Sequence, residues 1–165
     1  EAGSYATSYI PTYSVSATRA KDACNKTDAS GEINSTEGVL YAEFSLLSQD
    51  GITDRTIEIR QGSAESCKIR FLSNGTLRWT LIGNNTTIAR SLTLINTNTN
   101  KVAIRYNSAS ASIWINGSLA DTANNGMTYT ALNELNLNGF YSKTKAVAVY
   151  KEALTDAELA TLTTI

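Results

Sequence analysis

The sequence predicts an all-β chain, folded as a two-sheet antiparallel sandwich that closes with one short helix. Three observations support this prediction. Apolar residues recur at every second position of several short segments, which is the period of strands with one buried face. Asn, Gly and Ser separate these segments, as expected of turns. Residues 150–162 break the pattern with the end signals of a capped helix.

The first strongly alternating segments lie in residues 38–47 and 55–61. The first places its apolar side chains at even positions, with Glu43 and Ser45 between them, and the second sets Ile57 and Ile59 against polar neighbours. We expect each segment to be a strand with one face in the core.

Residues 67–83, "CKIRFLSNGTLRWTLIG", predict a hairpin whose register follows from the apolar pattern. A two-residue loop would place Phe71 opposite Arg78, whereas a three-residue loop that ends at Gly75 places Phe71 opposite Leu77. The second register also puts Trp79 on the core side, so we choose it. The opposite face then carries Lys68, Arg70, Arg78 and Thr80.

A second hairpin is predicted at residues 102–115, with Tyr106 opposite Ala111, Ile104 opposite Ile113 and Val102 opposite Ile115. The same register places Trp114 opposite Ala103, beside Arg105 and away from these aliphatic side chains. Trp114 is therefore either covered by a second packed layer or an exposed aromatic platform.

The remaining segments continue the same organisation. A turn at 116–117 leads into residues 118–122, residues 95–101 read as a loop, and residues 132–137 alternate imperfectly. Residues 146–150 form a last strand with Val147 and Val149 inward. Because no linker or repeat interrupts the chain, we expect residues 1–165 to be a single domain.

The closing segment has the signals of a short helix. Thr155 and Glu158 have the spacing of a capping box, and Leu154 and Leu159 are placed for a hydrophobic staple. Leu159 and Leu162 share a face. Two turns are not stable alone, so this face should dock on the sandwich.

Composition narrows the possible functions. The net charge of −1 gives no basic footprint for nucleic acid or anionic membranes, so we expect neither nucleic-acid binding nor membrane insertion. No apolar run approaches the ~20 residues of a spanning helix. Histidine is absent, which removes the commonest general base and metal ligand.

The two cysteines, Cys24 and Cys67, allow two readings. They could form one disulfide in an oxidising or extracellular setting, or they could be two unpaired small apolar residues. The first residues carry no signal-peptide pattern and no initiator Met, so we expect a processed chain or an excised domain.

Several motifs resemble one family. "AVAVYKEALTDAELATL" and "IWING" resemble the closing strand, helix and hairpin of concanavalin A-like and laminin-G-like jelly-roll domains. "GSYATSYIPTYSVSATRAKD" with "NSTEGVLYAEFS" resembles a subgroup found in phage tail-fibre, head-fibre and other virion surface proteins. The resemblance implies a two-sheet jelly roll, a C-terminal fragment of a longer protein, a homotrimer in the intact fibre, and a location on the virion surface, or alternatively at a cell surface.

Catalysis finds little support in the residues. Glycoside hydrolysis needs two carboxylates on either side of the scissile bond, and glucanases of this fold cluster theirs on one strand. Here Glu58 stands alone in residues 56–61 and Glu43 stands alone in its own strand. No His is present to activate a Ser or Cys nucleophile. We therefore expect a protein that is not an enzyme and requires no cofactor.

Calcium binding is a second possibility, because many domains of the resembled fold carry this ion. Asp50 and Asp54 lie in one turn, and Asp121 follows the Asn116–Gly117 hairpin. Calcium prefers such carboxylate and carbonyl oxygens. Turns of many proteins are rich in the same residues, so an ordinary turn is the alternative interpretation.

Carbohydrate binding is the more specific hypothesis, since sugars are held by an aromatic platform and a few fixed polar groups. The predicted registers turn Arg70, Arg78, Arg105 and Trp114 away from the core, and Tyr141 follows a turn. If these strands share a sheet, the surface would suit an acidic or sulfated glycan. The alternative is the charged outer face that antiparallel sheets normally have.

Three functions therefore remain open at this point. The first is an adhesion module that recognises a host glycan or cell-surface polysaccharide from a phage fibre or virion surface. The second is a structural fibre cap or capsid decoration without a ligand. The third is a carbohydrate-binding module of a bacterial surface hydrolase.

Overall fold

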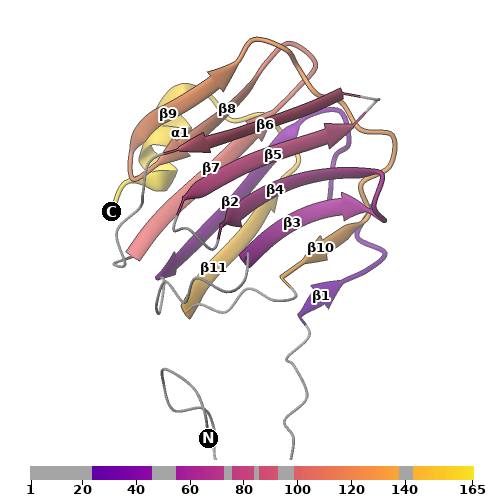
Figure 1. Cartoon of the computed structure of the whole chain (residues 1–165), viewed down its shortest axis with the longest axis horizontal. Helices are drawn as coiled ribbons and strands as arrows, with labels where there is room; N and C mark the ends of the chain where they lie inside the picture. Colours follow the sequence, from indigo (N-terminus) through magenta and orange to yellow (C-terminus); the bar gives the residue numbers. More distant parts are fainter. Residues whose placement is uncertain (1–23, 46–54, 73–75, 84–85, 93–98, 138–142) are drawn as a thin grey trace, which may run out of the picture.

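The structure is a computed structural model that describes residues 24–45, 55–72, 76–83, 86–92, 99–137 and 143–165. Two antiparallel sheets pack face to face, and one helix lies at the C-terminal end. Figure 1 shows the six-stranded sheet as the front layer and the five-stranded sheet behind it. The predicted jelly-roll sandwich is confirmed by this arrangement.

The front layer has the strand order β1-β10-β3-β4-β5-β6 (Figure 1). Its central strands alternate buried and half-buried residues, as expected of a sheet with one face in the core. The bounds are β1 Asn25–Lys26, β3 Arg55–Gln61, β4 Glu65–Phe71, β5 Leu77–Gly83, β6 Thr86–Leu92 and β10 Glu134–Asn136.

The second layer has the order β11-β2-β7-β8-β9. Its bounds are β2 Gly38–Ser45, β7 Thr99–Tyr106, β8 Ala111–Ile115, β9 Ser118–Ala123 and β11 Lys143–Tyr150. Strand β2 is buried almost throughout, because one face meets the core and the other lies beneath further side chains.

Both predicted hairpin registers are confirmed. Phe71 pairs with Leu77 across β4 and β5, and the amide of Leu72 donates to the carbonyl of Thr76 at 2.9 Å. Residues 73–75 themselves lie outside the described ranges. In the second hairpin, Ala103 pairs with Trp114 across β7 and β8, as the sequence predicts.

The main core fills the space between the sheets. Trp79 is fully buried there, as are its cross-strand partner Ile69 and Leu81, two residues along the same strand. Phe44 and Phe71 meet edge to face across the two sheets with ring centroids 4.8 Å apart. Such aromatic pairs contribute beyond their buried area, so this contact helps to hold the layers together.

The helix α1, Asp156–Thr163, docks on the outward face of the five-stranded sheet, against β7, β8 and β9. It has the predicted capping box between Thr155 and Glu158. Leu159 is fully buried, and Leu154 and Leu162 pack against the same cluster. The predicted staple and docking face are therefore confirmed.

The Asn116–Gly117 turn contacts the C-terminal end of α1. Both residues have positive φ, 50° and 84°, which suits the Asn-Gly sequence of a tight hairpin. The Gly117 amide donates to Thr163 Oγ1 at 3.1 Å, and Lys101 Nζ donates to the Thr164 carbonyl at 2.8 Å. The turn and the helix therefore stabilise one another.

The structure also differs from the sequence prediction. Strands β1 and β6 were not predicted, because β1 has two residues and β6 is largely polar. Strand β7 begins at Thr99, inside residues 95–101 that the pattern indicates as a loop. Within the described residues, no helix has the length and apolar character needed to cross a membrane.

Candidate functional site

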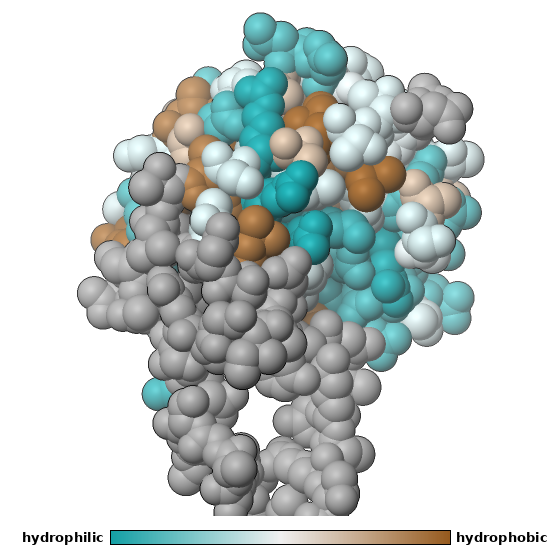
Figure 2. Space-filling model, viewed as in Figure 1, coloured by the Kyte–Doolittle hydropathy of each residue, from teal (hydrophilic) through white to brown (hydrophobic). Residues whose placement is uncertain are grey.

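Figure 2 shows polar side chains on the outward face of the six-stranded sheet, with apolar side chains among them. Strand pairing aligns its residues into rows that run across the strands. The central row is Asn25, Asn136, Glu58, Lys68, Thr80 and Ala89. On one side lies the Arg60 row, Glu134, Arg60, Ser66, Ile82 and Thr87, and on the other the arginine row, Thr56, Arg70, Arg78 and Ser91.

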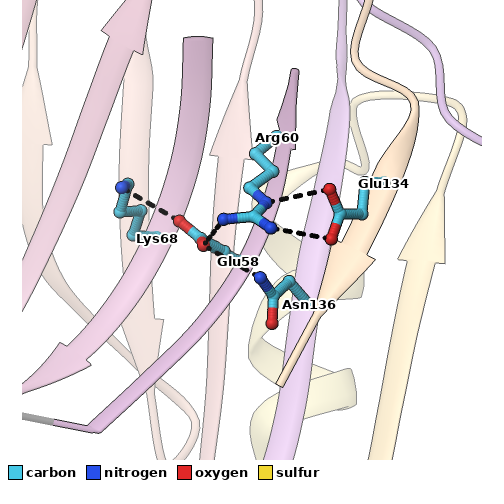
Figure 3. A network of polar contacts seen from close by, with 5 residues as sticks. All are labelled: Glu58, Arg60, Lys68, Glu134 and Asn136. Atoms are coloured by element: carbon cyan, nitrogen blue, oxygen red, sulfur yellow. Dashed lines mark hydrogen bonds and ion pairs between the residues drawn. The ribbon is translucent and has the colours of Figure 1, made fainter. Parts of the chain in front are cut away.

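An ion-pair network joins the Arg60 row to the central row (Figure 3). Arg60 makes a two-pronged contact with Glu134, from Nε at 3.0 Å and from Nη2 at 2.9 Å. Its Nη1 also reaches Glu58 Oε1 at 3.3 Å, and Lys68 Nζ lies 2.9 Å from Glu58 Oε2. Asn136 lies at 3.5 Å from the same Glu58 carboxylate. Both glutamates are therefore held by cations.

The network fixes the charge of Glu134. The hydrogen bonds from Arg60 lower the pKa of the Glu134 carboxyl, and the same contact raises the pKa of Arg60. A general acid of a glycosidase needs the opposite change, a raised carboxyl pKa. Glu134 is therefore held as a carboxylate by Arg60 and is not suited to donate a proton.

The arginine row concentrates positive charge. Arg70 and Arg78 are directly opposite one another on β4 and β5, and the row is completed by the neutral side chains of Thr56 and Ser91. Like charges in directly opposite positions oppose strand pairing. Arg78 is half-buried, and its Nε has no hydrogen-bond partner among the described residues. An anion that reached Arg78 would give its Nε an acceptor.

Two hydroxyl groups lie on the same face, Thr80 two residues from Arg78 along β5 and Ser66 opposite Arg60 in the Arg60 row. Ser66 is 2 % exposed and Thr80 is 5 % exposed, and neither Oγ atom has a hydrogen-bond partner within the described chain. A buried polar group without a partner costs about 1–3 kcal/mol. These hydroxyls would therefore gain from a polar ligand that reaches them.

Trp114 does not lie on this face. It is 7 % exposed and packs beneath α1 with Val39, Tyr41, Ala103 and Leu159. The exposed-platform interpretation is therefore wrong, and the alternative of a second packed layer is confirmed. Burial in this cluster, and then the nearby Glu43 charge, raise the pKa of Tyr41 to about 12.

Arg105, a predicted ligand-binding residue, instead contacts the start of α1. Its Nη1 donates to the Leu154 carbonyl at 3.1 Å and to Asp156 Oδ1 at 2.6 Å, so it holds the start of α1. It lies in the five-stranded sheet, whereas Arg70 and Arg78 lie in the other. The predicted cluster of four side chains is therefore divided into two pairs, Arg70 with Arg78 on one sheet and Arg105 with Trp114 on the other.

Of the three candidate calcium ligands, the structure describes Asp121 alone. Asp121 accepts hydrogen bonds from Trp79 Nε1 at 3.1 Å and from Arg90 Nη1 at 3.1 Å, so its carboxylate joins the two sheets. An adjacent guanidinium opposes cation binding there, which corrects the interpretation of Asp121. Asp50 and Asp54 lie outside the described residues, as does Tyr141. The described part of the chain contains no cluster of three or more potential metal ligands.

The two cysteines are not joined to one another. Cys24 is exposed, whereas Cys67 is fully buried in the main core. The disulfide interpretation is therefore corrected in favour of two separate thiols. Burial raises the pKa of the Cys67 thiol, so it behaves as a small apolar core residue.

Sequence reasoning missed part of the site. It placed Lys68, Arg70 and Arg78 on the correct face but gave no role to Arg60, Glu134 or Asn136. Arg60 and Glu134 are 74 positions apart, and they meet only because β10 pairs with β3. A short segment such as 134–136 carries no local signal for that pairing.

Comparison with known proteins supports the fold. No family model and no curated protein sequence matches the chain. Among solved structures, the CBM40 of the Ruminococcus gnavus IT-sialidase bound to α2,3-sialyllactose has a TM-score of 0.64 and 14 % identity, over 88 % of this chain and 97 % of that chain. At this identity the likeness concerns the fold.

Two further structures extend the comparison. A heptameric SAP-like pentraxin from Limulus polyphemus has a TM-score of 0.65 and 14 % identity, over 88 % of this chain and 77 % of that chain. The receptor-binding domain of botulinum neurotoxin type G has a TM-score of 0.56 and 14 % identity, over 84 % of this chain and 45 % of that chain. Lectin-like jelly-roll domains therefore share the architecture seen here.

Proposed function

We propose that this protein is a non-enzymatic carbohydrate-binding and adhesion module whose ligand is an acidic glycan. The observation that carries the proposal is the half-buried guanidinium group of Arg78 in the arginine row, whose Nε has no hydrogen-bond partner among the described residues. Guanidinium groups bind carboxylates and sulfates through paired hydrogen bonds. The likeness to a sialyllactose-bound CBM40 supports a glycan as the carrier of that acid.

The rest of the face suits sugar hydroxyls. Lys68, Thr80 and Asn136 offer donors or acceptors within the central row, next to the arginines. The described part of this face has no aromatic platform, because Trp79 points to the core and Trp114 lies on the other sheet. Binding at one site is therefore expected to be polar and weak, and multivalency would strengthen it.

The wider context follows from the sequence resemblance. We place the module, as one domain of a longer protein, in a trimeric phage fibre or at another virion surface, where it would bind a host cell-surface glycan. Trimerisation would present three copies of the face together. The likeness to the module of a sialidase favours a second setting, the carbohydrate-binding module of a bacterial surface hydrolase.

A glycan array tests this proposal. Arg78→Ala should abolish binding of acidic glycans while the melting temperature stays within a few degrees, because Arg78 has no described hydrogen-bond partner at Nε. Lys143→Ala is the matched control, since it removes one exposed positive charge from the other sheet. If the wild-type chain binds no glycan, the proposal fails and a structural fibre cap is favoured instead.

A further inference from the structure

Two buried hydroxyl groups on the outward face of the six-stranded sheet lack hydrogen-bond partners. Ser66 is 2 % exposed and Thr80 is 5 % exposed, and neither Oγ atom has a partner within the described chain. Arg78 Nε lacks a partner as well. Because native folds satisfy the large majority of buried polar atoms, three unsatisfied atoms on one face need a physical reason. A ligand that supplies the missing partners is such a reason.

The three side chains lie in successive rows of the face. Ser66 is in the Arg60 row on β4, and Thr80 and Arg78 are in the central row and the arginine row on β5. Successive rows are about 6.7 Å apart, because they are two residues apart along a strand. From the row of Arg78 to the row of Ser66 the distance is therefore about 13 Å.

The ion-pair network draws the neighbouring cations away from these hydroxyls. Lys68 lies between Glu58 and Thr80 in the central row, and its ammonium group contacts Glu58 at 2.9 Å. Arg60 is likewise bound to Glu134 on β10, on the side of β3 away from β4. Neither cation therefore satisfies the hydroxyl group beside it.

We propose that Ser66 and Thr80 are ligand-binding residues, and that the face takes an acidic oligosaccharide rather than a single acidic sugar. Arg78 would hold the acidic group, Thr80 a hydroxyl of the same sugar, and Ser66 a hydroxyl of the next sugar, because its row is twice as far from Arg78. The inference rests on the proposed function, since it concerns the ligand of the same face. It adds the minimum length and the direction of that ligand, with the acidic end at the arginine row.

The side chains that flank the two hydroxyls are long and partly exposed. Arg78 flanks Thr80 along β5 and is half-buried. Arg60 and Lys68 flank Ser66, and their side chains are 31 % and 26 % exposed. Exposed side chains change rotamer rapidly. A ligand therefore has to displace side chains, and not the backbone, to reach the hydroxyls.

An unsatisfied hydroxyl group gives a test that separates binding from structure. Removing it relieves a cost in the free chain but removes a hydrogen bond from the complex. Without ligand, Ser66→Ala and Thr80→Val should each raise the melting temperature by about 2–4 °C. Each should weaken a ligand that reaches its position about five-fold.

Ser112→Ala is the matched control. The Ser112 hydroxyl is also buried, at 0 % exposure, and also lacks a partner within the described chain. It lies on the other sheet, two residues from Trp114 on the face that α1 covers. Ser112→Ala should therefore raise the melting temperature as Ser66→Ala does and leave every affinity unchanged.

The experiment is a titration of the intact chain and its variants, followed by NMR, with two pairs of probes. Each pair contains an acidic sugar alone and the same sugar joined to neutral sugar: N-acetylneuraminic acid with α2,3-sialyllactose, and glucuronic acid with cellobiouronic acid. In at least one pair the longer probe should bind wild type about five-fold more tightly. Thr80→Val should weaken both members of that pair, whereas Ser66→Ala should weaken the longer probe alone.

Two results would overturn the inference and leave the proposed function standing. In the first, each acidic sugar alone binds as tightly as its longer partner, a comparison that needs no variant. In the second, Ser66→Ala binds the longer probe no more weakly than Ser112→Ala does. If none of the four probes binds wild type, the proposed function fails and this inference fails with it.

Discussion

Arg105 donates to Asp156 at 2.6 Å and, through the same nitrogen, to the Leu154 carbonyl at 3.1 Å. This contact joins the C-terminal end of β7 to the start of α1. The helix is thereby held over the outward face of the five-stranded sheet, where it covers Trp114 and Tyr41. Arg105 and Trp114, which the sequence indicated as part of a ligand-binding surface, instead hold α1 and pack beneath it.

The position of Trp114 predicts a loss of stability on truncation. Trp114→Ala should lower the free energy of unfolding by about 3–5 kcal/mol, because it leaves a cavity between the sheet and α1. Leu119→Ala is the control: Leu119 pairs with Trp114 across β8 and β9 but is 50 % exposed. Urea denaturation measures both, and an unchanged midpoint for Trp114→Ala would contradict the buried position.

The capping box predicts a smaller effect at the start of α1. In Thr155→Ala the Glu158 amide loses its acceptor and the cap hydroxyl no longer contacts the Glu158 carboxylate. We expect a loss of about 1 kcal/mol, and about 2–4 °C in melting temperature. Thr161→Ala is the control within the same helix, since the Thr161 hydroxyl donates to the Ala157 carbonyl and takes no part in the cap.

The cap and the hairpins show which features a sequence can predict. The register that pairs Phe71 with Leu77 follows from alternation and a glycine-containing turn, both within a few residues. The Thr155–Glu158 box is equally local. In each case neighbouring residues contain the whole physical reason, so no knowledge of the remaining fold is needed.

The candidate site depends on distant pairings, which the sequence does not reveal. Strand alternation shows that Trp114 faces away from the main core, but it does not show that α1 covers that face. Similarly, Arg105 and Arg70 have equivalent patterns along their strands, yet the strands belong to different sheets. Sheet membership follows from long-range packing and decides which of these side chains can meet.

Asp121 predicts a link between the two sheets. Its carboxylate accepts from Trp79 Nε1 of β5 and from Arg90 of β6, while Asp121 itself lies on β9. Asp121→Ala should cost about 1–3 kcal/mol, because it leaves the buried indole N–H without a partner. Asp121→Asn retains an acceptor for the indole and should recover part of that loss. Equal stability of all three proteins in thermal denaturation would refute the link.

Glu134 predicts a contribution to stability that depends on pH. The hydrogen bonds from Arg60 lower its pKa in the folded state below the value of about 4.3 expected in the unfolded chain. A lowered carboxyl pKa stabilises the fold at pH values above the unfolded pKa, and this contribution is lost as the pH falls through the folded pKa. Wild type should therefore exceed Glu134→Gln in unfolding free energy at pH 7, and the difference should shrink as the pH falls below about 4.

Denaturant titrations from pH 7 to pH 2.5 measure this difference directly. Glu32→Gln is the control, because its carboxylate is 61 % exposed and pairs only with Lys26 among the described ion pairs. Its difference from wild type should be small, since exposed ion pairs contribute little. A Glu134→Gln difference that is constant over the whole range would show that Arg60 stabilises the neutral side chain as well as the carboxylate, and would refute the lowered pKa.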